Sequence, residues 1–256
     1  MARLGGGVYL WLVYGFLYLP MAALVAYSFN SSKYGTRWEA PTLQWYGNLV
    51  RDAALLDAAL NSLTVAVLAA TLGTLIGTLG AIGLRRYRYP GREYIRSLLF
   101  VTMMQPDIVM GVALLVLFIA LRVQLGFWSL LLAHTTFCLP FVAVTVMARL
   151  KDFDERLVEA AEDLGATEGQ ALWHVILPLA LPAIAAGWLL SFTLSLDDVV
   201  VSFFVTGPAF EVLPLRIYSM VRMGVKPEVN ALATLLFVVS LGLVSASQVL
   251  LARGRR

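Results

Sequence analysis

Long uncharged stretches alternate with short polar segments along the whole chain. Four stretches contain no Asp, Glu, Lys or Arg, namely residues 4–32, 58–84, 123–148 and 229–252. Two more, residues 97–121 and 183–205, are interrupted only by acids. A helix needs about 20 residues to cross a hydrocarbon layer of about 30 Å, so each stretch is long enough for one crossing. The pattern predicts an all-α integral membrane protein with six transmembrane helices.

Composition and charge fit this interpretation. Of the 256 residues, 60% are hydrophobic and 14% are charged, which is unlike an ordinary soluble domain. The net charge of +3 does not indicate nucleic-acid binding, because basic residues gather at predicted helix ends, in residues 85–96 and 253–256. This bias predicts that both termini lie in the cytoplasm. The single cysteine, Cys138, excludes an intrachain disulfide.

We expect residues 1–57 to form a membrane anchor followed by an exterior segment. The first apolar stretch is longer than the apolar region of an ordinary signal peptide, so we expect it to be retained. A helix at the membrane interface is then predicted over residues 43–50. Its Trp45 would either join the aromatic belt or make a cation–π contact at the outer mouth of a transport pathway. Residues 58–252 would form the transmembrane core and residues 253–256 a basic tail.

The second apolar stretch is rich in small residues. Gly73 and Gly77 stand four residues apart in it, on one face of the predicted helix. Small residues at this spacing let two helix backbones approach closely. We therefore expect this helix to pack centrally within the protein.

Three acids lie inside predicted membrane helices: Asp107, beside Pro106, and the adjacent pair Asp197 and Asp198. Pro106 removes a backbone hydrogen bond, so we expect the helix to bend there. Each intramembrane carboxylate costs about 3 kcal/mol on insertion scales. No Lys or Arg occurs inside the same apolar stretches to neutralise them. A pathway lined by these acids, with Ser195 beside them, would therefore prefer a cation.

Structural roles for these acids stay open at this point. Asp107 could pair with His134 of the next helix, and the acids could cap broken helices or pair across a subunit interface. Adjacent residues on a helix point about 100° apart. Asp197 and Asp198 can therefore both face one lumen only if the lumen is wide or the helix is broken.

The longest polar segment between two apolar stretches covers residues 152–182. Its first part predicts a short surface helix, because apolar side chains recur there at helical spacing while charged ones face elsewhere. The apolar positions are Leu157, Ala160, Ala161 and Leu164.

Capping residues define where helices begin and end in this polar segment. Asp152 and Glu155 can form a capping box at the start, and Gly165 is typical of the position just past a helix end. Thr167 and Gln170 can form a second box directly afterwards. Two helices are therefore predicted to meet at Gly165, and the small residues there would let another protein come close.

Part of this segment resembles the EAA loop of ABC-importer permeases. The matching residues are Glu159, Ala160, Ala161, Gly165, Leu177 and Pro178, whereas Val175 stands where the family usually has isoleucine. In that family the loop is a pair of coupling helices that docks into a groove on a cytoplasmic ATPase. The resemblance implies an ATPase contact made by Glu159, Ala160, Ala161, Gly165 and Glu168. The alternative is an ordinary amphipathic connector at the membrane surface.

Beyond this loop, nearly the whole chain resembles the polyamine (spermidine/putrescine) import permeases of the same family. The most specific match is LSLDDVVVSFFVTGP at residues 194–208, and further matches include MMQPDIVM at residues 103–110 and PEVNALAT at residues 227–234. The resemblance implies the type I ABC importer permease fold in a bacterial inner membrane. It also implies three kinds of partner: a second, related permease, two ATPase copies and a periplasmic polyamine-binding protein.

The sequence contains no Walker glycine loop, no cluster of metal ligands and no Ser-His-Asp arrangement. We therefore expect no enzymatic activity and no cofactor in this chain, with ATP and Mg bound by the partner ATPase. Two other functions fit the intramembrane acids. One is an ABC permease for another cation, such as ferric iron or thiamine, and the other is a proton-coupled secondary transporter.

Overall fold

The structure is a computed structural model and describes residues 2–32, 37–151, 153–154, 156–224, 227–238 and 241. In this described part the chain is helical, with one isolated antiparallel bridge between Asn30 and Pro41. The prediction of an all-α protein is thus confirmed. The chain forms two compact units, one of Met1–Leu56 with Arg216–Arg256 and the other of Asp57–Leu215.

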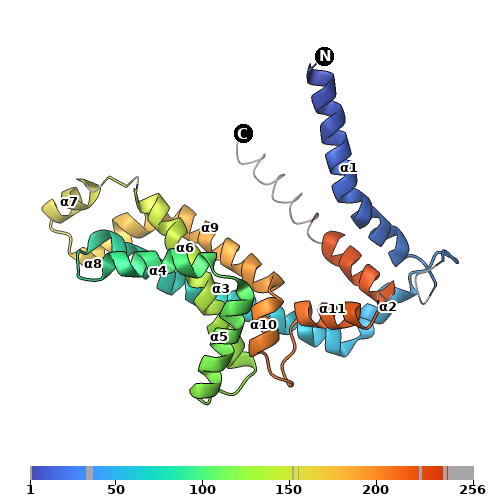
Figure 1. Ribbon diagram of the computed structural model, residues 1–256. Coiled ribbons are helices and arrows are strands. Elements are labelled where there is room, and N and C mark those ends of the chain that lie inside the picture. Colours follow the sequence, from blue (N-terminus) through green and yellow to red (C-terminus); the bar gives the residue numbers. More distant parts are fainter. Residues whose placement is uncertain are drawn as a thin grey trace. The chain divides into compact units, whose positions relative to one another are not determined.

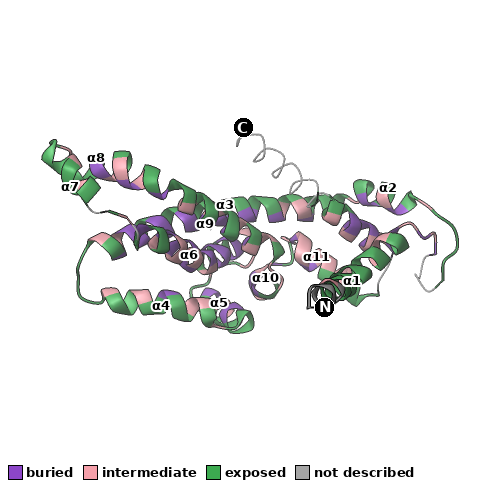
Figure 2. Cartoon of the chain, turned by 90° about the horizontal axis from the view of Figure 1, so that it is seen from above, coloured by how far each residue is buried: buried purple, intermediate pink, exposed green. Residues whose placement is uncertain are grey.

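The first unit contains α1 (Ala2–Ser28) and α2 (Gln44–Arg51). The described residues of α1 are almost all exposed (Figure 2), although most of them are apolar; Trp11 is 81% exposed and Phe16 is 80% exposed. A helix that is apolar on all sides suits a lipid environment. The predicted anchor and the predicted interfacial helix are therefore both present as helices.

Three long helices run through the second unit: α3 (Ala53–Arg86), α6 (Phe127–Lys151) and α9 (Leu177–Asp197). Helix α6 packs along α9 and is buried over much of its length (Figures 1 and 2). Val142 of α6 contacts the positions of two glycines, Gly77 of α3 and Gly187 of α9. A Cβ added at Gly77 would stand 2.9 Å from the Val142 Cβ, which confirms the prediction of close packing at this glycine.

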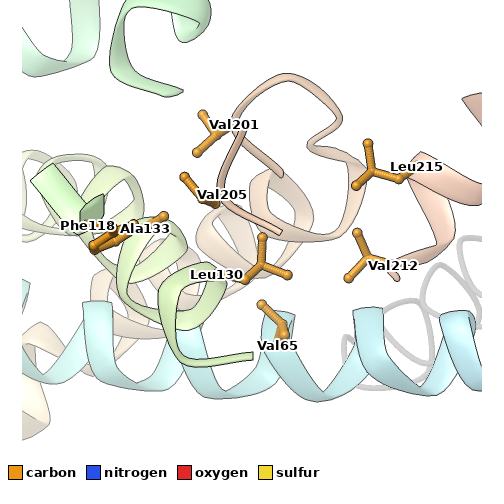
Figure 3. Packing of buried hydrophobic residues seen from close by; sticks show 8 residues of the cluster. All are labelled: Val65, Phe118, Leu130, Ala133, Val201, Val205, Val212 and Leu215. Carbon is orange, nitrogen blue, oxygen red and sulfur yellow. The ribbon is translucent and has the colours of Figure 1, made fainter. Parts of the chain in front are cut away.

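A hydrophobic cluster within the second unit contains residues from five helices. Leu130 and Ala133 of α6 lie at its centre and are fully buried, and Figure 3 shows Val65 of α3 and Val205 of α10 beside them. The helices that reach the cluster include α5 (Asp107–Ala120), α10 (Val200–Val205) and α11 (Leu213–Arg222). The cluster fixes the short helices α5 and α10 to the long ones.

Two of the predicted spans are broken. The third is divided into α4 (Arg92–Met104) and α5, which meet at an angle of 113° on either side of Gln105 and Pro106. Proline cannot donate a backbone hydrogen bond, so the bend that the sequence predicted at Pro106 has this cause. The fifth span ends its long helix at Asp197 and continues in α10. Helices α5 and α10 pack together (Figure 1), so the two breaks adjoin one another.

The fifth span begins earlier than the predicted residue 183. A turn of π-helix, Leu172–Ile176, joins α8 (Glu168–Ala171) to α9, so that Glu168–Asp197 is one helical stretch of 30 residues. At 1.5 Å per residue this stretch is about 45 Å long, which exceeds the hydrocarbon thickness. The apolar stretch in the sequence therefore covers only the later part of this helical stretch.

Within the described residues, four helices are long and apolar enough to cross a membrane, and the bent pair of α4 and α5 would make a fifth. The four are Tyr9–Ser28, Ala53–Arg86, Phe127–Lys151 and Glu168–Asp197. The sixth predicted span, residues 229–252, lies mostly outside the described residues. Its described beginning belongs to a shorter apolar helix, Pro227–Val238. The number six therefore stays a prediction.

Candidate functional site

Three acids that are far apart in the sequence line one pocket beside the two helix breaks. Asp107, Asp197 and Asp198 share this pocket, which has a volume of about 320 Å³. The other lining residues are aromatic or aliphatic: Phe137, Phe141, Leu194, Val199, Val200 and Val201. Among these described lining residues there is no basic side chain. The site therefore combines concentrated negative charge with aromatic faces.

The helix breaks explain how the acids come together. Asp107 is the first residue of α5, directly after the bend at Pro106, and it is exposed. Asp197 is the last residue of α9, and Asp198 follows in extended conformation with ψ of 125°. On an unbroken helix the two adjacent carboxylates would diverge by about 100°. The second break is thus what lets Asp197 and Asp198 line the same pocket.

Asp198 also supports the broken span structurally. Its carboxylate accepts hydrogen bonds from the backbone N–H groups of Val201, at 3.2 Å, and Ser202, at 2.7 Å. These amides at the start of α10 have no carbonyl partner within their own helix. The sequence analysis left open that an acid caps a broken helix, and for Asp198 this alternative is confirmed. Asp198 therefore both caps α10 and lines the pocket.

His134 connects the two sides of this break. Its Nδ1 lies 2.7 Å from the Ser195 hydroxyl on α9, and its Nε2 lies 3.0 Å from the Ser202 hydroxyl on α10. The same Nε2 is 3.6 Å from Oδ2 of Asp198. The alternative in which His134 pairs with Asp107 is therefore wrong, because the break brings Asp198 to the histidine instead.

The two remaining residues of the predicted pathway lie elsewhere. Ser195 is buried against His134 and is not among the residues that line the pocket. Trp45 belongs to the first unit, where it is buried and its indole N–H donates to the carbonyl of Asn30 at 2.8 Å. This hydrogen bond joins α2 to Asn30, which forms the isolated bridge with Pro41.

Sequence reasoning did not single out the aromatic side of the pocket. Phe137 and Phe141 stand four residues apart on α6, and Phe137 also lies near His134, with ring centroids 5.1 Å apart. The spacing of three and seven residues after His134 places all three side chains on one helix face. This face could have been read from the sequence once His134 was suspected of a role.

The second candidate site is the polar segment with the EAA resemblance. Its first helix, α7 (Arg156–Asp163), contains no buried residue, and Leu164 directly after it is 90% exposed. Gly165 has φ of +87°, a conformation that favours glycine, and so ends the helix as predicted. Thr167 and Gln170 form the predicted capping box. The other predicted box, Asp152 with Glu155, lies outside the described residues.

Within this segment Glu159, Ala160 and Glu168 are exposed, whereas Ala161 is partly covered. Glu168 also has partners inside the chain: Tyr87 donates to it at 3.3 Å, and the Arg86 guanidinium lies 3.7 Å away. Much of the surface of α7 is thus left uncovered by the described part of the chain.

An ion pair links α7 to the end of α3, and the sequence did not predict it. Arg86, the last residue of α3, donates to Glu162 of α7 at 2.7 Å. Glu159 shares with Arg86 a pocket of about 180 Å³ between these elements. Arg86 and Glu162 are 76 residues apart in the sequence, so this ion pair joins α7 to the end of α3.

Comparison with known proteins identifies the class of molecule that this arrangement resembles. Residues 55–256 match the sequence model of the family described as "Binding-protein-dependent transport system inner membrane component". The chain is 58% identical over 255 residues to the spermidine/putrescine transport system permease protein PotC of Escherichia coli K12, covering 100% of this chain and 96% of that protein. It is 46% identical over 237 residues to the putrescine transport system permease protein PotI of the same strain, covering 90% and 84%.

Solved structures agree on the fold. One chain of a bacterial ABC transporter involved in the import of the acidic polysaccharide alginate matches with a TM-score of 0.74 at 17% identity, covering 95% of each chain. The MetNI methionine ABC transporter in an inward-facing conformation matches with a TM-score of 0.63 at 18% identity, covering 83% of this chain and 98% of that one. At these identities the likeness shows the fold alone.

Proposed function

This chain belongs to the family of binding-protein-dependent transport system inner membrane components, and from this membership we infer that it forms half of an ATP-driven polyamine import pathway. Like its permease relatives, it is a multi-pass membrane transport subunit and not an enzyme. The two relatives described above support this cargo, because one is a spermidine/putrescine permease protein and the other a putrescine permease protein by name.

The single observation that carries the cargo proposal is the convergence of Asp107, Asp197 and Asp198 on one pocket. A polyamine presents several ammonium groups along a flexible apolar chain. Carboxylates bind ammonium groups through charge-assisted hydrogen bonds, and aromatic faces such as those of Phe137 and Phe141 attract cations. In this proposal the three acids hold successive ammonium groups while the methylene segments pass over the aromatic and aliphatic walls.

The broken helices support a pathway at this pocket. Irregular backbone within a membrane is tolerated where it lines a cavity or is covered by protein, and transporters use such breaks at their binding sites. Here one break supplies Asp107 and the other supplies Asp197 and Asp198. An acid placed at a break can exchange between a helix-capping role and a cargo-binding role without leaving the pocket wall.

We further propose that α7 and the turn after it dock on a cytoplasmic ATPase, with Glu159, Ala160, Ala161, Gly165 and Glu168 at the contact. The exposed surface of α7 and the 90% exposed Leu164 support a protein partner there. ATP and Mg would be bound by that partner. The ion pair between Arg86 and Glu162 would then pass the movement of the docked helix to α3.

The complete assembly in this proposal contains a second, related permease, two ATPase copies and a periplasmic polyamine-binding protein, in a bacterial inner membrane with both termini of this chain in the cytoplasm. The test is reconstitution of the purified assembly in vesicles with labelled spermidine and putrescine. Uptake that requires ATP, the ATPase and the binding protein is the expected result. Uptake driven by a proton gradient with no ATPase present would overturn the proposal in favour of a secondary transporter.

A further inference from the structure

The ends of three helices form a basic pocket beside the coupling region. Its volume is about 540 Å³, within the roughly 300–1,000 Å³ of ordinary ligand sites. Four lining residues are basic and four are apolar: Arg85, Arg92, Arg96 and Lys151, with Phe100, Val144, Met147 and Ala148. No acid lines it among the described residues. This composition differs from that of the acidic pocket at the helix breaks.

The basic and the apolar residues are separated along the helix axes. On α4 the arginines come first and Phe100 follows Arg92 by eight residues, which is about 12 Å along the helix. On α6 the order is reversed: Val144 and Met147 come first, and Lys151 is the last residue. Since α4 packs against α6, the charges of both helices lie at one end of the pocket and the apolar side chains at the other.

One donor in this pocket lacks a hydrogen-bond partner. The Nε of Arg92 is shielded from solvent and makes no hydrogen bond within the described part of the chain. Its nearest acidic oxygen, on Glu93, is 3.7 Å away, whereas Glu93 is bound more closely by Arg96, at 3.0 Å. Buried donors are nearly always paired in native proteins. Arg92 lines the pocket, and its guanidinium therefore has hydrogen-bonding capacity that the described part of the chain does not use.

We propose that this pocket binds an anionic phospholipid, with its phosphate among the four basic residues and the start of an acyl chain on Phe100 and Met147. A basic rim with an apolar floor, set at the ends of membrane helices, matches a ligand that is itself charged at one end and apolar at the other. A soluble phosphate would use the basic rim only and would leave Phe100, which is 47% exposed, without a function. The proposal is independent of the cargo.

The test uses the assembled importer purified in detergent, with phosphatidylglycerol and phosphatidylcholine as probes and native mass spectrometry as the readout. We expect phosphatidylglycerol to be retained in preference to phosphatidylcholine. Each of the changes Arg92→Gln and Lys151→Gln should lower phosphatidylglycerol binding by about fivefold, the factor that corresponds to about 1 kcal/mol per basic residue near a membrane surface. Two separate variants are used so that, if one fails to assemble, the other still tests the proposal.

The matched control is Arg88→Gln. Arg88 lies on the connection between α3 and α4, is exposed and does not line the pocket, so removing its charge should leave lipid binding unchanged. Equal retention of the two lipids, or an equal loss in the control, would overturn the proposal. So would displacement of the lipid by inorganic phosphate alone, which would indicate a soluble-anion site. Lipid binding only when the ATPase is absent would also overturn it, because a protein would then cover the pocket in the assembly.

Discussion

The guanidinium of Arg86 lies 2.7 Å from the carboxylate of Glu162, so the end of α3 is joined to a helix that is 76 residues further along the chain. Both side chains are partly exposed, at 23% and 40%. A pair of this kind contributes at most about 1 kcal/mol to stability. The importance of this pair is therefore its position, because it joins α7, which carries the proposed ATPase contact, to α3 of the membrane core.

This contact gives the first prediction. Arg86→Gln or Glu162→Gln should leave the complex assembled but lower ATP-driven uptake by about fivefold, the effect of losing about 1 kcal/mol of coupling energy. The measurement is the number of ATP molecules hydrolysed per polyamine imported in reconstituted vesicles. Arg88→Gln serves as the control because Arg88 is exposed and next to the same helix end.

A charge exchange makes this test specific. Arg86→Glu combined with Glu162→Arg restores the pair with the opposite polarity, so the double variant should regain part of the uptake that each single variant loses. Simple additivity of the two defects would mean that the residues act separately. Glu168, which lies 3.7 Å from Arg86, limits the recovery because it would repel a carboxylate introduced at position 86.

The acidic pocket gives the second prediction. Asp107→Asn and Asp197→Asn remove a charge with little change in shape, and each should weaken polyamine transport about tenfold or more, as expected for the loss of a charge-assisted hydrogen bond. Concentration-dependent uptake by the reconstituted assembly measures the effect. Asp57→Asn is the control, because Asp57 is exposed and lies outside the pocket. Unchanged uptake in both pocket variants would remove these acids from the pathway.

Asp198 should behave differently from the other two acids. Asp198→Asn keeps an oxygen for one of the two capping bonds from Val201 and Ser202 but loses the other acceptor oxygen. We expect lower uptake together with a lower melting temperature of the purified complex. Asp197→Asn should lower uptake alone, because neither of these two capping bonds involves Asp197. A normal melting temperature in the Asp198 variant would contradict the capping role.

The third prediction concerns the histidine that bridges the break. His134→Ala leaves the buried hydroxyls of Ser195 and Ser202 without their partner, which should destabilise the protein by about 1–3 kcal/mol. Thermal unfolding of the purified complex measures this change. The chain has one other histidine, His174, which is exposed, so His174→Ala should change the melting temperature little. Equal effects of the two substitutions would contradict the bridging role.

Local sequence signals predicted the local features of this fold. Pro106 marked the bend in the third span, Gly165 marked the end of α7, and Thr167 with Gln170 marked the start of α8. Each signal acts within a few residues, through a missing donor, a positive φ or a capping bond. The sequence also predicted a cation site at the intramembrane acids, from their cost without basic neighbours. The structure places these acids on one pocket, and the binding of a cation there stays a prediction.

Contacts between distant segments could not be predicted in this way. The acidic partner of His134 depends on the break after α9. The sequence suggested Asp107 as this partner, whereas the structure shows Asp198. The pairing of Arg86 with Glu162 depends on the packing of α3 against the coupling region. The early start of the fifth helix was missed because residues 168–176 are too polar to be recognised as part of a membrane span.

The fourth prediction tests the close approach of α3 and α6. A Cβ at Gly77 would lie 2.9 Å from the Val142 Cβ and 3.0 Å from the Leu139 carbonyl oxygen, and neither atom belongs to a flexible side-chain end. Gly77→Ala should therefore separate the helices and cost about 1–3 kcal/mol, as overpacking does in other cores. Gly80 is on the same helix with open space around it, so Gly80→Ala should be neutral or stabilising by up to about 1 kcal/mol through helix propensity. The expected result is a lower melting temperature of the purified complex for Gly77→Ala and an unchanged or higher one for Gly80→Ala. A stabilised Gly77→Ala variant would mean that the two backbones can separate there without loss.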